Sequence, residues 1–305
     1  MITHLLRCAS ILPLTLAAAL PLAAQASSGQ KTFANPNEAV LALVAAVRTG
    51  DQGQLLAVLG PASKDLVSSG DTVADKTSRE NFLKMYTAKH SLSTEAPGYK
   101  TLVVGTSDWP MPIPIVRDGT VWYFDSNLGH DEILHRRIGN NELGAIAVCE
   151  GYVRAQTEYA ARGHDGQAAG TYAQKISSSP GKQDGLYWPV AAGQPQSPLG
   201  PSVAAAEAEG YNGSDKGPYH GYIYKLLKAQ GADAPGGAKS YFDNGKLASG
   251  FALLAYPANY GVSGIMTFMV NQDGTIYQND LGDNTANAAS KLTTYNPDQS
   301  WTPIE

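Results

Sequence analysis

Histidine and acidic side chains that lie close together in the sequence are the first candidates for metal binding. The segment His130-Asp-Glu-Ile-Leu-His135 combines both kinds of side chain. Asp131 and His135 lie four residues apart and would share one face of a helix, but the two histidines lie five apart, which separates them by more than a quarter turn. Because this is not the spacing of a His-Glu-x-x-His zinc site, we interpret the segment as a solvated turn.

A second group of oxygen-bearing side chains follows Asn271, in Asn271-Gln-Asp-Gly274 and then at Asn279, Asp280 and Asp283. Calcium prefers several oxygen ligands close together, but the spacing of an EF-hand is absent. Asp-Gly between two strand-like segments is also a common hairpin turn. We therefore favour a turn, and the sequence predicts neither a metal nor a cofactor.

Residues suited to nucleophilic catalysis are present but form no recognisable motif. Gly-x-Ser-x-Gly does not occur, and Ser263 precedes Gly264 at the start of an expected strand, without the strand-to-helix turn that exposes a nucleophile. The histidines at positions 90, 130, 135, 164 and 220 are far apart in the sequence. A hydrolase would need a site assembled from distant residues, and a cleft that collects several of these histidines would favour it.

Aromatic side chains are the remaining signal for binding. Tyr187 and Trp188 lie in a stretch, residues 163–200, that is rich in Gly, Ser, Pro and Gln. Tyrosine and tryptophan give a large contact area at low entropic cost, so this pair is our candidate binding surface. Other tyrosines crowd the second half: Tyr211, Tyr219, Tyr222, Tyr224, Tyr256 and Tyr260. For those on expected strands we favour a role in a sheet core.

The elements that position these residues begin with three short helices. Asn35-Pro36 and Asp51 are typical of helix starts, and Thr77-Ser-Arg-Glu80 is a capping box. Strand-like segments then follow at 101–104, 113–116 and 121–124. We expect an α+β domain over residues 27–138, whose order of elements resembles the nuclear-transport-factor-2-like fold.

The sequence of the second half predicts one long helix followed by an antiparallel sheet. The helix is expected from about Asn140 to Arg162, with Cys149 as an inert thiol on its buried face. A short helix is expected at 201–209, followed by strands at 220–229, 250–256, 264–270 and 275–278. This gives a second domain over residues 139–282, and we expect the polar residues 283–305 to form a loosely held tail. The fold class is α+β.

The first 26 residues have the features of a secretory signal. Arg7 precedes an apolar run from Ile11 to Leu22, which is too short to span a membrane and ends in Ala24-Gln25-Ala26. A retained anchor is the less favoured alternative, because the run contains two prolines. Without Arg7 the chain has 21 basic and 27 acidic side chains, a net charge of −6, which does not favour nucleic acid as a partner.

Unusual strings spread over the chain identify it as a member of an uncharacterised family of exported bacterial proteins, the domain-of-unknown-function family 2950. They are Trp109-Pro-Met-Pro-Ile-Pro114, Trp122-Tyr-Phe-Asp125, His135-Arg-Arg-Ile-Gly-Asn-Asn-Glu142, Pro180-Gly-Lys-Gln-Asp-Gly-Leu-Tyr-Trp188, Tyr256-Pro-Ala-Asn-Tyr-Gly-Val-Ser-Gly264 and Met269-Val-Asn-Gln-Asp-Gly274. The family implies no activity.

A second resemblance concerns the helix and sheet of the second half. The run from Asn141 to Ala160, with Ser263–Phe268 and Asp273–Ile276, is similar to the globular part of type IV pilin-like and pseudopilin proteins. Pilins begin with an exposed apolar helix, whereas a separate domain precedes the helix here. The likeness therefore implies a fold rather than filament assembly.

These observations favour an exported, non-enzymatic protein in the periplasm or outside the cell, which binds a partner or helps an envelope assembly. The partner is expected to be an envelope protein or a small ligand. The alternative is a periplasmic, hydrolase-like enzyme with a site built from residues far apart in the sequence.

Export gives the first testable prediction. N-terminal sequencing of the protein purified from its native envelope should give Ser27 or a neighbouring residue, because Ala24-Gln25-Ala26 matches the small-x-small pattern that signal peptidase accepts. Recovery of the protein with Met1 retained, in a membrane fraction, would contradict the prediction.

Overall fold

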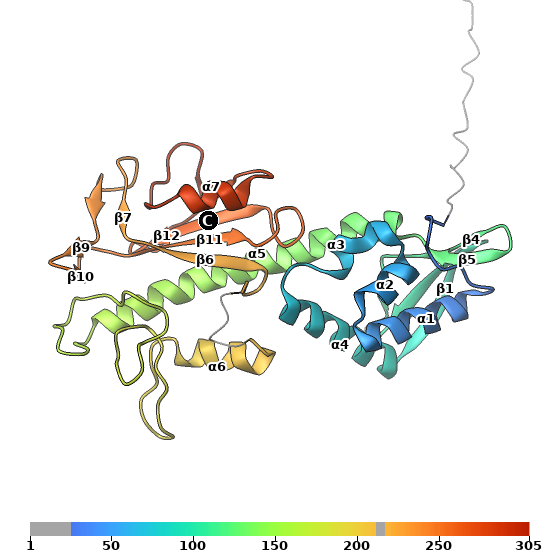
Figure 1. Ribbon diagram of the computed structural model, residues 1–305, viewed down its shortest axis with the longest axis horizontal. Helices are drawn as coiled ribbons and strands as arrows, with labels where there is room; N and C mark the ends of the chain where they lie inside the picture. Colours follow the sequence, from blue (N-terminus) through green and yellow to red (C-terminus); the bar gives the residue numbers. More distant parts are fainter. Residues whose placement is uncertain (1–25, 212–216, 305) are drawn as a thin grey trace, which may run out of the picture.

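The computed structural model describes residues 26–211 and 217–304, and it consists of two lobes joined by one long helix (Figure 1). The first lobe is a helical layer on an antiparallel sheet. The second is another five-stranded antiparallel sheet, with a helix on each face. Each lobe has its own hydrophobic core, so the α+β class predicted from the sequence is confirmed.

The helices of the first lobe begin at polar caps. The Asn35 side chain accepts a hydrogen bond from the Glu38 amide, and Asp51 accepts one from Gln54, as their sequence positions predicted. The last helix begins at Thr72 rather than at Thr77, because Asp71 caps it by accepting from the amides of Val73 and Ala74. The helices are α1 (Pro36–Thr49), α2 (Gln52–Leu59), η1 (Pro61–Ser63), α3 (Lys64–Val67) and α4 (Thr72–Ala88).

The first sheet has the order β1-β2-β4-β5, and the short β3 pairs with β2. Its strands are β1 (His90–Ala96), β2 (Tyr99–Val104), β3 (Trp109–Pro110), β4 (Ile115–Asp118) and β5 (Val121–Phe124). The sequence did not predict β1, whose residues are mostly polar and exposed, as suits a strand at the edge of a sheet. Leu102, Ile115 and Phe124 pack into the core beneath α1 and α2.

Helix α5 (Ser126–Ala160) is 35 residues long and runs through both lobes (Figure 1). The predicted start near Asn140 was wrong, because Leu134 and Ile138 are already buried on an apolar stripe of the same helix. The boundary expected between residues 138 and 139 therefore falls inside a continuous helix. Within the described ranges, no helix has both the length and the apolar character needed to cross a membrane.

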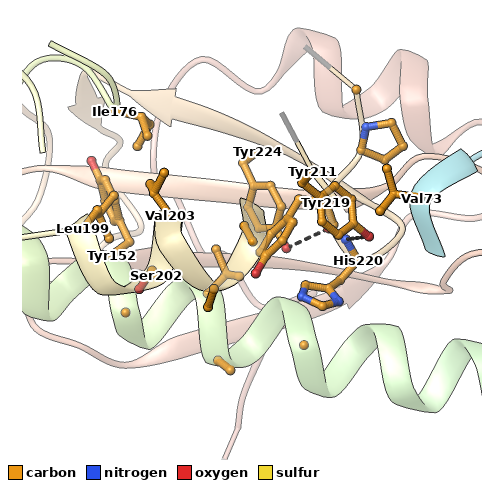
Figure 2. A pocket seen from close by; sticks show the side chains of 18 of the residues that line it. Val73, Tyr152, Ile176, Leu199, Ser202, Val203, Tyr211, Tyr219, His220 and Tyr224 are labelled. Carbon is orange, nitrogen blue, oxygen red and sulfur yellow. Dashed lines mark hydrogen bonds between the residues drawn. The ribbon is translucent and has the colours of Figure 1, made fainter. Parts of the chain in front are cut away.

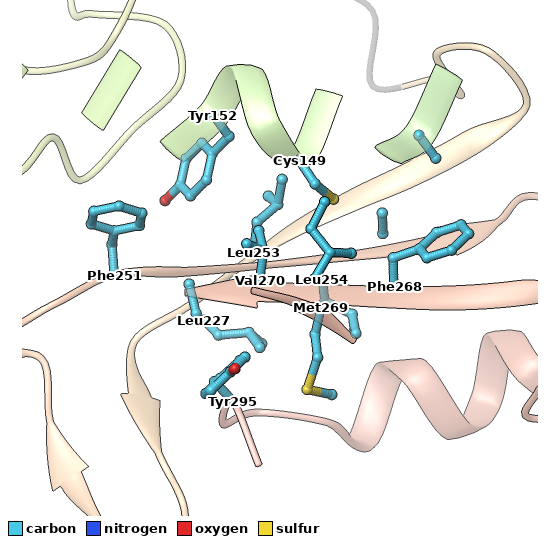
Figure 3. Packing of buried hydrophobic residues seen from close by; sticks show 14 of the residues in the cluster. Cys149, Tyr152, Leu227, Phe251, Leu253, Leu254, Phe268, Met269, Val270 and Tyr295 are labelled. Carbon is cyan, nitrogen blue, oxygen red and sulfur yellow. The ribbon is translucent and has the colours of Figure 1, made fainter. Parts of the chain in front are cut away.

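The second sheet is an antiparallel meander with the order β14-β13-β12-β11-β6. Cys149 and Tyr152 of α5 cover one face, and Met269 and Tyr295 lie on the opposite face (Figure 3). Cys149 is fully buried, which confirms its predicted position on the buried face of the helix, and burial raises its pKa to about 12. The strands of this sheet are β6 (Tyr222–Leu227), β11 (Ala252–Pro257), β12 (Met266–Asn271), β13 (Ile276–Asp280) and β14 (Thr302–Pro303). Two small two-stranded sheets lie beside it: β7 (Ala229–Gln230) pairs with β8 (Lys239–Ser240), and β9 (Phe242–Asp243) pairs with β10 (Lys246–Leu247).

The C-terminal residues are not the loosely held tail that the sequence predicted. Residues 283–304 form α7 (Thr285–Lys291) and end with β14, which pairs with β13. Tyr295 is only 1% exposed and Trp301 only 8%. These two aromatic rings, isolated in a polar sequence, anchor the segment on the face of the sheet that α5 leaves free.

The stretch from 163 to 199 has no helix or named strand, but specific contacts hold it. Gln156 of α5 is fully buried, and its side chain exchanges two hydrogen bonds of 2.9 Å with the backbone of Ala173. The backbones of Ile176 and Ser178 pair with that of Tyr187. Helix α6 (Gly200–Glu209) follows at the predicted position, closed by Gly210.

Two glycines of α5 give a matched test of how this helix packs. A Cβ added at Gly129 would lie 2.5 Å from the carbonyl oxygen of Pro112, whereas one added at Gly139 would meet nothing within 4 Å. Gly139→Ala should stabilise the protein by about 0.5–1 kcal/mol, the usual gain in a helix. Gly129→Ala should destabilise it by about 1–3 kcal/mol through the clash. Urea unfolding measures both, and equal effects would contradict the packing of α5 against the β3–β4 connection.

Candidate functional site

The histidine and acidic cluster at the start of α5 forms a contact between two helices, α5 and α3. The segment from His130 to His135 is helical, so the expected turn was wrong. The His130 ring lies 2.8 Å from an Asp65 carboxylate oxygen and 3.1 Å from one of Asp131. Hydrogen bonds to Asp131 and Asp65 raise the His130 pKa against the opposing effect of burial. In the described part of the chain, no group of three or more His, Cys, Asp or Glu residues could hold a metal.

The other two motifs have structural roles. Asn271 accepts a hydrogen bond of 3.1 Å from the amide of Asp273, and this closes the tight turn between β12 and β13, as the sequence indicated. Ser263 is fully buried, and its hydroxyl bonds the backbone of Asn259. This serine therefore stabilises the loop before β12.

Tyr187 and Trp188, the candidate binding surface, are half-buried. The Trp188 ring packs beside two other rings at the end of α5, with centroids 6.4 Å from Tyr159 and 5.4 Å from His164. The Tyr187 backbone forms hydrogen bonds with the backbones of Ile176 and Ser178 in the same loop. Neither residue lines the large cavity described below.

A cavity of about 570 Å³ lies between α5, α6 and the second sheet, with the start of α4 at one end (Figure 2). Its volume is within the range of about 300–1,000 Å³ that is usual for small-molecule sites. Apolar side chains and backbone form most of the wall. The main apolar contributors are Ala147, Val148, Ile176, Leu199, Val203 and Leu253.

Small residues on α5 create much of this space. Gly144 and Gly151 face the cavity, and Ala147 lies between them one helical turn from each. A Cβ at Gly144 would lie 3.4 Å from the Cβ of His220, so the glycine lets His220 approach the helix closely. Because these side chains are small, α5 leaves open space on the face that it turns toward α6.

Polar groups meet at the end of the cavity near α4. Asp71 is 2% exposed, and one carboxylate oxygen accepts from the Tyr211 hydroxyl at 2.9 Å and from the Gly221 amide at 3.0 Å. The His220 amide donates to the same hydroxyl at 3.3 Å. His220 adopts a left-handed backbone conformation, φ 50°, which is unfavourable for a residue with a side chain. Asp71 thus joins the first lobe to the second at the cavity.

Three tyrosines line this polar end, and all three stay protonated at neutral pH. Burial is the main cause that raises the pKa of Tyr211, Tyr219 and Tyr224. The Asp71 carboxylate adds to the shift at Tyr211, and Glu209 adds to it at Tyr219. The hydroxyls are therefore neutral hydrogen-bonding groups at neutral pH.

The sequence signalled part of this site. Tyr211, Tyr219 and Tyr224 were noted as aromatic, but for Tyr224, on an expected strand, we favoured a sheet core. Asp71 was missed, because its partners Tyr211 and Gly221 lie 140 and 150 residues further along the chain. The cavity itself depends on how α6 packs, which no local pattern indicates.

Trp188 can be tested as a packed residue. Trp188→Ala should lower the free energy of unfolding by about 2 kcal/mol, less than a fully buried tryptophan would, because the residue is only partly buried. Val190→Ala, a more exposed position of the same loop, should change it by less than about 0.5 kcal/mol. Urea unfolding compares the two variants, and an unchanged stability for Trp188→Ala would return this residue to the list of binding candidates.

Comparison with known proteins identifies a family but no activity. No curated protein matches the chain, and no solved structure matches it. The likenesses to nuclear-transport-factor-2-like and pilin-like folds therefore stay predictions from topology and sequence. A family model described as "Protein of unknown function (DUF2950)" matches residues 30–304. The chain belongs to the DUF2950 family.

Proposed function

We propose that this protein is an exported binding protein, which takes up a small and largely apolar molecule in the cavity between α5, α6 and the second sheet. The observation that carries the proposal is the cavity itself. It combines a volume of about 570 Å³ with an apolar wall and one polar end, the combination that is usual in sites for small ligands.

The distribution of the histidines favours binding over the hydrolase alternative. Of the five histidines beyond the signal segment, only His220 lines the cavity. His90 stacks on Tyr86 and His164 stacks on Tyr159, and neither lines the cavity. The hydroxyl groups at that end belong to tyrosines with raised pKa values, which makes them poor nucleophiles.

Export to the periplasm or the outside of the cell is part of the proposal. It is supported by the apolar run that ends in Ala24-Gln25-Ala26. A role in envelope assembly has weaker support, because it depends on the likeness of the second half to pilin-like proteins. A built cavity is a more specific feature than a shared arrangement of helix and sheet.

A cavity-filling variant tests the binding site. Val203 of α6 points into the cavity (Figure 2), and Ala204, the next residue, does not line it. The uncharged dye N-phenyl-1-naphthylamine should bind the wild-type protein with an increase in fluorescence. Val203→Trp should weaken this binding at least about tenfold by occupying the space, and Ala204→Trp should leave it unchanged.

The dye titration has two results that would contradict the proposal. One is the absence of any saturable fluorescence increase with the wild-type protein. The other is equal affinity in Val203→Trp and Ala204→Trp, with both variants shown by circular dichroism to be folded.

A further inference from the structure

The charged side chains around the cavity are distributed unevenly along its length. The buried carboxylate of Asp71 lies at the α4 end, and Glu207 also lines the cavity. Among the described lining residues, Arg154 is the one Lys or Arg. It lies ten residues beyond Gly144 on α5, which is about 15 Å along the helix, and its side chain is 75% exposed. The buried charge among the described lining residues is therefore the carboxylate of Asp71 at the α4 end, where His220 is the one basic side chain, and Glu207 is exposed like Arg154.

Aromatic rings form the walls at the same end. The rings of Tyr211 and Tyr219 lie 4.8 Å apart between centroids and nearly perpendicular, at 77°. Tyr224 stands next to them, with its hydroxyl 3.4 Å from the Tyr219 carbonyl oxygen (Figure 2). The face of an aromatic ring carries partial negative charge, and pairs or triplets of such rings bind quaternary ammonium groups.

The buried carboxylate reinforces these rings. The Tyr211 hydroxyl donates its hydrogen bond to Asp71, and this polarises the phenol so that its ring becomes more electron-rich. Both carboxylate oxygens of Asp71 already accept hydrogen bonds, one from two backbone amides of α4 and the other from the Gly221 amide and the Tyr211 hydroxyl. Asp71 therefore favours a cation through its field and through Tyr211, without a direct contact.

An anionic end group would be disfavoured here. The field of the buried Asp71 carboxylate would repel it, and Glu209 lies next to the same end, 3.5 Å from the His220 ring. The raised pKa values of Tyr211 and Tyr219 also reflect this field, although burial is the larger cause.

We infer that the ligand is an amphiphilic organic cation, with an ammonium group at the tyrosine end and an alkyl or aryl body along the apolar wall of α5 and α6. The inference rests on the binding function proposed above and specifies its ligand class. A cation over aromatic rings in a desolvated site gains about 5- to 30-fold in affinity over a neutral group of similar size.

A series of ligands with one common chain tests the charge preference. Octyltrimethylammonium, octanol and octyl sulfate are titrated below their micelle-forming concentrations against the protein loaded with N-phenyl-1-naphthylamine. The ammonium compound should displace the dye at a concentration about 5- to 30-fold lower than octanol, and octyl sulfate should be the weakest.

The outcomes separate this inference from the proposed function. If the dye binds and the three compounds compete equally, or if octyl sulfate competes best, the ligand class is wrong while the binding site stands. If the dye does not bind, the proposed function fails.

Two variants locate the preference. The preference is the ratio of the octanol concentration to the octyltrimethylammonium concentration that displaces the dye. In Tyr219→Leu this ratio should fall to about one third of its wild-type value or less, because the ring face is lost. Tyr219→Phe should keep most of the preference. An unchanged ratio in Tyr219→Leu would overturn the role of the tyrosine walls.

Discussion

The structure depends on one constraint, which is that α5 is a single helix with two different buried faces. Near its middle, Arg137 donates hydrogen bonds to the carbonyl oxygens of Asp65 and Leu66 in the first lobe. One turn later, Glu142 accepts from the amides of Ile265 and Met266 in the second lobe. Because a helix is stiff over this distance, these bonds fix the two lobes relative to each other.

The cavity follows from that arrangement. Helix α5 covers the second sheet with Cys149 and Tyr152, and the neighbouring face of the same helix, with glycines and alanines, faces α6. Asp71, which caps α4 in the first lobe, reaches across to Tyr211 and Gly221 and closes one end. Asp71 therefore both caps α4 and joins the two lobes. Its removal should destabilise the protein, because its buried partners would be left without hydrogen bonds.

The sequence predicted the parts with local signals and missed those that depend on distant contacts. Caps at Asn35 and Asp51, the turn at Gly274 and the buried Cys149 were all predicted, because each depends on neighbours in the chain. The start of α5, the edge strand β1 and the packed C-terminal segment were missed, because packing rather than periodicity decides them. At the site, the aromatic signal was noticed, but Asp71 and the role of α6 required the fold.

Hydrogen exchange measured with and without N-phenyl-1-naphthylamine is the sharpest test of whether a ligand binds between α5, α6 and the second sheet. With dye, exchange should slow in α6 (Gly200–Glu209) and in the segment from Tyr219 to Tyr224, with no change in the first sheet. Protection confined to the loop around Trp188, or to strands β1–β5, would show that the dye does not bind in this cavity.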